Sequence, residues 1–129
     1  MLPPTYMPNC NQHLIIGALA TGGVCLILEL CKSNADPEHQ VDLSRVASWA
    51  ALGTLAAALP DLIEPAHHPR HRGFAHSMAT GTAAVYLLQS DWLNRACDPV
   101  LADMLRPLLV GYLSHLGADS ETPMGLPFV

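Results

Sequence analysis

Apolar and polar residues alternate along the chain as four long apolar segments separated by three polar or proline-rich breaks. The apolar segments cover residues 14–31, 42–59, 74–93 and 99–118, and the breaks cover residues 32–41, 60–73 and 94–98. Segments of this length that are rich in alanine and leucine are typical of helices, and no run alternates polar and apolar residues as a strand would. The pattern predicts one all-α domain over residues 1–129, with an irregular tail at residues 120–129.

Capping residues and prolines mark the expected helix ends. Asp42 or Ser44 can cap the second helix, and Pro60 is expected to stop it. Asp98 can cap the fourth helix, with a proline directly after it at the first helical position. Pro107 is expected to kink that helix. Four helices joined by short connections most simply form an up-down-up-down bundle.

Composition narrows the class of protein without deciding whether it lies in a membrane. Half of the 129 residues are apolar and 13% are charged, which excludes intrinsic disorder. Six basic residues against eleven acidic ones argue against an extended nucleic-acid surface. The mean hydropathy of +0.27 is high for a soluble domain. The first apolar segment, interrupted only by Glu29, is the one that fits a membrane span best.

The bundle topology would gather most of the unusual polar residues at one pole. The start of the first helix, the end of the second, the start of the third and the end of the fourth all meet there. The residues that fall at this pole are His13, Asp61, Glu64, His67, His68, His71, Arg72, His76, His115 and Asp119. The opposite pole receives His39 alone of the seven histidines. The polar pole is therefore the candidate functional site.

Residue types and spacing at this pole favour a metal site. His115 and Asp119 are four residues apart, so both would point to one face of a helix, as paired ligands do in helical zinc motifs. His71 and His76 can join them from the loop and the start of the third helix. Neutral imidazoles and carboxylates are ligands for Zn²⁺, Mn²⁺ or Fe²⁺. Taken singly, such residues are more often helix caps or hydrogen-bonded pairs.

The number of donors exceeds what one tetrahedral ion needs. The expected metal ligands are His13, Asp61, His71, His76, His115 and Asp119. We expect two Zn²⁺ or Mn²⁺ ions that share a ligand and activate a water, although one ion also remains open. His67 and His68 adjoin a proline in an expected exposed loop and are not counted as ligands.

Two further residues are candidates for catalysis. Glu64 could be a ligand, a general base or the hydrogen-bond partner of a histidine N–H. Arg72 could hold a phosphate oxygen through its planar guanidinium group, or could pair with Asp61 or Glu64. The sequence does not rank these roles.

Three motifs follow an early histidine, His13, along the chain: Leu-Pro-Asp at 59–61, HRGFAHS at 71–77 and the pattern G-Y-x-S-H-x-x-x-D-x-x-T-P-x-G at 111–125. In these motifs and their order, the chain resembles the YdjM-like family of inner-membrane metal-dependent hydrolases. The resemblance implies a helical, membrane-associated protein with a divalent metal site at the six expected ligands. In one departure, Ile63 stands where many members have a second aspartate, and Glu64 follows it.

These observations lead us to expect a metal-dependent hydrolase of a phosphoester, acting on a small molecule or a lipid through a metal-activated water. The alternative from another class is a non-catalytic metal-binding or metal-handling membrane protein, and a third is a purely structural polar cluster. We expect the protein in a bacterial-type inner membrane, or in the cytoplasm if it is soluble.

Overall fold

The computed structural model describes residues 9–65, 73–121 and 125–128 and is helical throughout its regular elements. It contains α1 (Cys10–Ala35), α2 (Leu43–Ile63), the short 3₁₀ helix η1 (Phe74–His76), α3 (Met78–Gln89), α4 (Trp92–Ala96) and α5 (Pro99–Ser120). No strand occurs among these described residues. The prediction of an all-α fold is therefore confirmed, with five α-helices in this part of the chain where four were expected.

The first helix begins at a reciprocal cap that the hydrophobic pattern does not reveal. The Asn9 side chain accepts the Gln12 backbone N–H at 3.0 Å, and the Asn9 N–H donates to the Gln12 side chain at 2.7 Å. These two hydrogen bonds satisfy the backbone N–H groups of Asn9 and Gln12 at the helix start. As a result α1 begins at Cys10, one turn before the apolar segment, and His13 lies within the first turn of the helix.

The second helix continues past the proline that was expected to end it. The Asp42 side chain caps α2 as predicted, by accepting the Arg45 N–H at 3.0 Å. Pro60, however, is buried within the last turn, and the Glu64 N–H donates to its carbonyl at 2.9 Å. A proline removes one hydrogen bond, but its fixed φ is itself helical. Asp61 consequently lies on α2 rather than in the following loop.

The expected third helix, residues 74–93, is divided into three pieces. Ser77 has extended backbone angles, which end η1, and its side chain caps α3 by accepting the Thr80 N–H at 3.2 Å. The backbone of Ser90 is also extended, and α3 ends there. The next helix, α4, spans the boundary between the expected helix at 74–93 and the expected break at 94–98. The fourth expected helix starts at Pro99 as predicted, with Asp98 accepting two backbone N–H groups.

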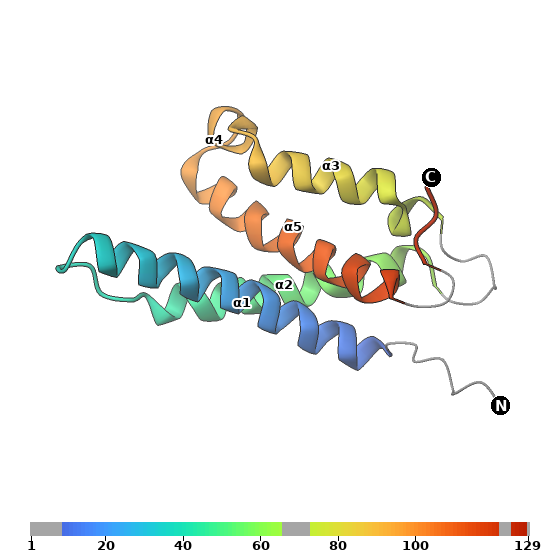
Figure 1. Ribbon diagram of the computed structural model, residues 1–129, viewed down its shortest axis with the longest axis horizontal. Coiled ribbons are helices and arrows are strands. Elements are labelled where there is room, and N and C mark those ends of the chain that lie inside the picture. The colour runs from blue at the N-terminus through green and yellow to red at the C-terminus, as the bar shows by residue number, and fades with distance from the viewer. Residues whose placement is uncertain (1–8, 66–72, 122–124, 129) are drawn as a thin grey trace.

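Helices α1, α2 and α5 form the packed core, and α3 lies against α5 on the side away from α1 (Figure 1). Glycines permit the close approach of α1 and α5 to α2. A Cβ on Gly17 would lie 2.5 Å from the Ala57 Cβ, and a Cβ on Gly111 would lie 2.7 Å from the Gly53 Cα. Small residues at crossing points let helix backbones approach closely, as in membrane helices.

The direction of the helices gathers four helix ends at one end of the molecule. The start of α1, the end of α2, the start of α3 and the end of α5 lie toward the same side, whereas the α1–α2 connection and α4 lie at the other (Figure 1). The expected metal ligands that lie in the described part of the chain are thus brought to one end of the structure.

Two helices are long and apolar enough to cross a membrane. Both α1 and α2 meet this criterion by length and composition, where the sequence analysis favoured the first segment alone. Only 22% of the apolar window of α1 and 28% of that of α2 are buried inside the structure. Large apolar side chains such as Leu19 and Leu55 therefore face outward. Extensive exposed apolar surface of this kind marks contact with a membrane or another protein.

Candidate metal centre

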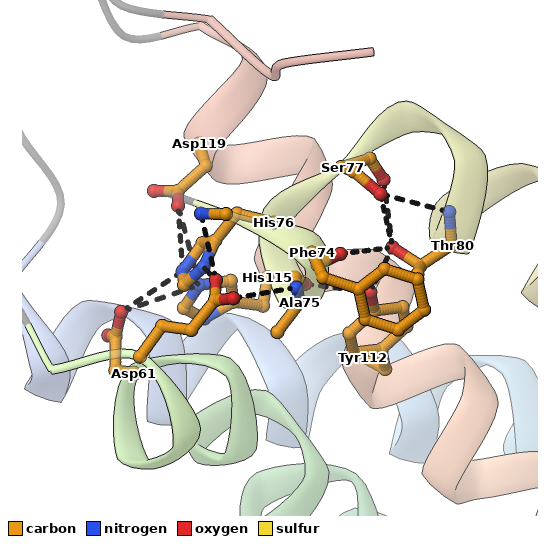
Figure 2. Close-up of polar contacts among 11 residues, drawn as sticks. Asp61, Phe74, Ala75, His76, Ser77, Thr80, Tyr112, His115 and Asp119 are labelled. Atoms are coloured by element: carbon orange, nitrogen blue, oxygen red, sulfur yellow. Dashed lines mark hydrogen bonds and ion pairs between the residues drawn. The ribbon is translucent and has the colours of Figure 1, made fainter. Parts of the chain in front are cut away.

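Five of the six expected metal ligands lie in one cluster built from four elements. His13 comes from the first turn of α1 and Asp61 from the last turn of α2. His76 lies in η1, and His115 and Asp119 lie near the end of α5. Figure 2 shows the imidazoles of His76 and His115 between the carboxylates of Asp61 and Asp119.

Hydrogen bonds on the far side of each ring orient the two imidazoles. His115 Nδ1 lies 2.7 Å from the Ala57 carbonyl oxygen, which can only accept, so Nδ1 carries the hydrogen. His76 Nδ1 lies 3.0 Å from a Glu64 carboxylate oxygen and likewise donates. The Nε2 atoms of the two rings face each other at 3.2 Å, and His76 Nε2 also lies within hydrogen-bond distance of Asp61 Oδ1, at 3.3 Å. Two imidazole nitrogens this close to each other and to a carboxylate have the arrangement that ligands of one cation would have.

Carboxylate oxygens complete this arrangement. Asp61 Oδ1 lies 3.3 Å from His76 Nε2 and 3.7 Å from His115 Nε2. Asp119 Oδ2 lies 3.4 Å from His115 Nε2 and 3.7 Å from His76 Nε2. Ligand bonds of about 2.0–2.1 Å in a tetrahedral zinc site imply ligand atoms about 3.4 Å apart. The donors of His76, His115 and Asp119 lie within 4.8 Å of one another, a spacing that a small divalent ion can bridge.

His13 lies beside this group and has an unsatisfied atom. Its ring stacks on that of His115 with centroids 4.0 Å apart, and its Nε2 lies 3.4 Å from Asp119 Oδ1. Its Nδ1 is buried, and among the described residues it has no hydrogen-bond partner. Buried polar atoms are nearly always satisfied, so this nitrogen is a candidate donor to a bound ion or water. His13, Asp61 and His115 also place one donor each within 4.8 Å of one another.

The cluster is enclosed except on one side. The side chains of His76 and His115 are fully buried, and those of His13 and Asp119 are almost so. Asp61 is different, because its side chain is 34% exposed. The site is therefore accessible from outside along Asp61.

Glu64 holds the turn that carries His76. Besides His76 Nδ1, its carboxylate accepts the Gly73 N–H at 3.0 Å and the Ala75 N–H at 3.2 Å. Partial burial raises the pKa of Glu64, but the hydrogen bonds from His76, Ala75 and Gly73 outweigh this and lower the pKa below its usual value. Of the roles left open by the sequence, the contact present in the structure is that of a hydrogen-bond partner for a histidine N–H.

Tyr112 supports the same turn and has no role assigned in the sequence analysis. Its hydroxyl oxygen lies 2.7 Å from the Ala75 carbonyl oxygen and 2.7 Å from Thr80 Oγ1 (Figure 2). Thr80 Oγ1 in turn lies 3.1 Å from the Phe74 carbonyl oxygen. The available signal was its position one helical turn before His115, which places both side chains on neighbouring parts of one face.

Several predicted residues lie outside the described part of the chain. These are His67, His68, His71 and Arg72. Within the described residues the possible ligands form two overlapping groups, His13–Asp61–His115 and His76–His115–Asp119. The groups share His115, whose single free nitrogen can bind one ion. The expectation of two ions therefore stays a prediction.

Comparison with known proteins finds similarity to the inner membrane protein YdjM of Escherichia coli (strain K12) and of Shigella flexneri. In each case the chains are 38% identical over 61 residues, which make up 46% of this chain and 29% of the relative. The chain thus matches less than a third of the length of these relatives. Over the matched part, this finding confirms the resemblance to the YdjM-like membrane family. No family model and no solved structure matches the chain.

Proposed function

We propose that this chain is a membrane-associated, metal-dependent hydrolase that cleaves a phosphoester. The observation that carries the proposal is the pair of facing Nε2 atoms of His76 and His115, set between the carboxylates of Asp61 and Asp119. A buried group of lone pairs and negative charges is costly without a cation, and these donor types suit Zn²⁺ or Mn²⁺.

The ion would be held by His76, His115, Asp61 and Asp119, with His13 as a fifth donor. A divalent ion at such a site lowers the pKa of a bound water and stabilises negative charge that develops during hydrolysis. A second ion would need further donors, such as His71, which lies outside the described residues.

The surrounding residues keep the donors in place. The Ala57 carbonyl and the Glu64 carboxylate each hold the far nitrogen of one imidazole, which fixes both its tautomer and the direction of its Nε2 lone pair. Such partners of ligating histidines typically matter 10- to 100-fold, as an order of magnitude, for metal affinity. We assign Glu64 this positioning role, and Arg72 the role of holding a phosphate oxygen of the substrate.

An apolar groove beside the cluster supports a substrate with a hydrocarbon part. The groove has a volume of about 560 Å³, and Glu64 and Ala75 line it at the end next to His76. From there it follows α3 and α5 as far as Leu87 and Leu109. A groove with this lining suits an alkyl chain better than a nucleotide or sugar, so we propose a lipid phosphoester as the substrate class.

Location in an inner membrane agrees with the other observations. The matched relatives are named inner membrane proteins, and α1 and α2 are long and apolar enough to span a bilayer. A metal-handling protein remains the alternative. It would place ionisable groups along an ion path near the middle of the bilayer. The observed donors instead lie at helix ends, with His13 in the first turn of α1 and Asp61 in the last turn of α2.

Elemental analysis of the purified protein tests the proposal. We expect at least one equivalent of a transition metal per chain in the wild type, and its loss together with hydrolysis of phosphoesters in His115→Ala and Asp119→Ala. The matched control is His39→Ala at the other end of the molecule, which should retain both. Wild-type protein that binds no metal after reconstitution would refute the proposal. Bound metal without hydrolysis of any lipid or soluble phosphoester would favour the metal-handling alternative.

A further inference from the structure

A second polar cluster lies at the end of the molecule opposite the candidate metal centre. Its centre is Glu29 of α1, whose side chain is 1% exposed. The carboxylate accepts hydrogen bonds from Lys32 at 2.9 Å, from His39 at 2.8 Å and from Arg45 at 2.6 Å. Of the histidines, His39 is the one expected at this end from the sequence. Among the described residues, Glu29 is the most extensively paired carboxylate there.

Arg45 extends the cluster to α5. Its guanidinium group donates to both carboxylate oxygens of Asp103, with Nε at 3.1 Å from Oδ2. The same group lies 5.1 Å from the centre of the Trp49 ring. One arginine of α2 thereby connects a carboxylate of α1 with a carboxylate of α5, and the three helices are joined at this level.

A pocket opens on this cluster and carries an excess of positive charge. It has a volume of about 410 Å³, and Lys32, Arg45 and Arg106 line it together with Asp103. These three cations face two carboxylates, those of Glu29 and Asp103, so one positive charge is left unmatched. The remaining acidic residues at this end, Asp36, Glu38, Asp42, Asp91 and Asp98, are exposed and are not among the pocket-lining residues.

The position of the pocket identifies the kind of anion. Lys32 lies in the last turn of α1 and Arg45 in the first turn of α2, and among the described residues these two helices are both long and apolar enough to span a membrane. Cations at the ends of membrane helices lie at the level of the lipid headgroups, and basic pockets there bind anionic lipids. Two apolar side chains also line the pocket and are exposed, Val100 to 70% and Met104 to 48%.

We propose that this pocket binds the phosphate of an anionic phospholipid. Lys32 and Arg106 contact the phosphate, Arg45 contributes its charge from the base of the pocket, and the acyl chains lie along Val100 and Met104. The site is separate from the candidate metal centre, and the proposal does not depend on hydrolysis.

Native mass spectrometry of the detergent-purified protein tests this. The probes are phosphatidylglycerol and phosphatidylcholine with identical acyl chains, followed by competition with inorganic phosphate. The test variants are Arg106→Gln, which leaves the Glu29 hydrogen bonds intact, and Lys32→Gln combined with it. Arg95→Gln is the matched control, because Arg95 lies at the same end, pairs with Asp91 and is not a pocket-lining residue.

We expect the wild type and Arg95→Gln to retain one phosphatidylglycerol in preference to phosphatidylcholine. Arg106→Gln should weaken retention about fivefold and the double variant about 25-fold, since each basic residue near a membrane surface contributes a factor of about five. Unchanged helical circular dichroism would show that the variants fold. Equal retention of the two lipids, equal losses in Arg95→Gln and Arg106→Gln, or displacement of the lipid by millimolar inorganic phosphate would each overturn the proposal.

Discussion

The crossing of α2 and α5 allows a sharp test of how the helices are held, because two glycines of α5 have opposite surroundings. A Cβ at Gly111 would lie 2.7 Å from the Gly53 Cα and 2.8 Å from the Gly53 carbonyl carbon. A Cβ at Gly117 would meet nothing within 4 Å. Replacing each glycine with alanine makes the same chemical change at a closed position and at an open one.

The two substitutions should shift stability in opposite directions. Alanine is favoured over glycine inside a helix by about 1 kcal/mol, so Gly117→Ala should gain up to this amount. At Gly111 the neighbour is backbone, which cannot rotate away as a side chain can. Overpacking costs about 1–3 kcal/mol, and contacts this short should approach the upper value. After the gain in helix propensity, Gly111→Ala should lose about 2 kcal/mol.

Thermal unfolding in detergent, followed by circular dichroism, measures the difference. At roughly 4 °C for each kcal/mol in a chain of this size, the melting temperature should rise by up to about 4 °C in Gly117→Ala and fall by about 8 °C in Gly111→Ala. Gly111→Ala should also bind metal less tightly. Separation of α5 from α2 would lengthen the 2.7 Å contact between His115 Nδ1 and the Ala57 carbonyl.

A Gly111→Ala protein as stable as the wild type would refute this reasoning. It would show that α5 packs less closely on α2 than the structure has it, and the position of His115 would then have to be revised as well. A loss in Gly117→Ala equal to that in Gly111→Ala would show that some general property of α5, rather than the crossing point, sets the cost.

Two other changes test the polar clusters at either end. Glu64→Gln should weaken metal binding about 10- to 100-fold while the protein stays folded, because the partner that orients His76 loses its charge; metal affinity equal to that of the wild type would contradict the positioning role. Arg45→Met should destabilise the protein by about 2 kcal/mol in thermal unfolding, because Glu29 and Asp103 each lose a charged hydrogen-bond donor, although Glu29 keeps Lys32 and His39. Arg95→Met removes an exposed pair and should cost less than about 1 kcal/mol; an equal loss in both would contradict this account.

The convergence of the candidate ligands at one end was predictable because it depends on chain direction alone. Once residues 14–31, 42–59, 74–93 and 99–118 are recognised as helices, alternating directions bring His13, Asp61, His76 and His115 to one end. The errors in the helix ends did not matter for this. Pro60 was expected to stop α2, yet Asp61 stays at the same end of the molecule whether it lies on the helix or just after it.

The contacts between side chains were not predictable in the same way. Glu64 was open to three roles, because the sequence does not show which way the turn at 73–76 faces. In the structure that turn directs two backbone N–H groups and His76 Nδ1 at the Glu64 carboxylate. Similarly, Arg45 and Asp103 are 58 residues apart, and nothing in their local sequence connects them. A signal did exist at Glu29, since a single charge within an apolar helix generally has a specific partner.

The two ends of the molecule differ in how their buried charged groups are balanced. At the Glu29 end the carboxylate has three donors with hydrogens to give, from Lys32, His39 and Arg45. All four lysine and arginine residues in the described part of the chain lie at this end. The cluster is thus satisfied by the protein itself.

At the other end, histidines and aspartates are gathered without a lysine or arginine among the described residues. The Nε2 atoms of His76 and His115 approach to 3.2 Å, with Asp61 and Asp119 beside them, and the buried Nδ1 of His13 lacks a partner among the described residues. A divalent ion would be held by such donors at distances of about 2 Å, and this is the arrangement on which the proposed function rests. The same three long helices thus carry a cluster balanced by lysine and arginine at one end and, together with η1, a cluster of histidines and aspartates at the other.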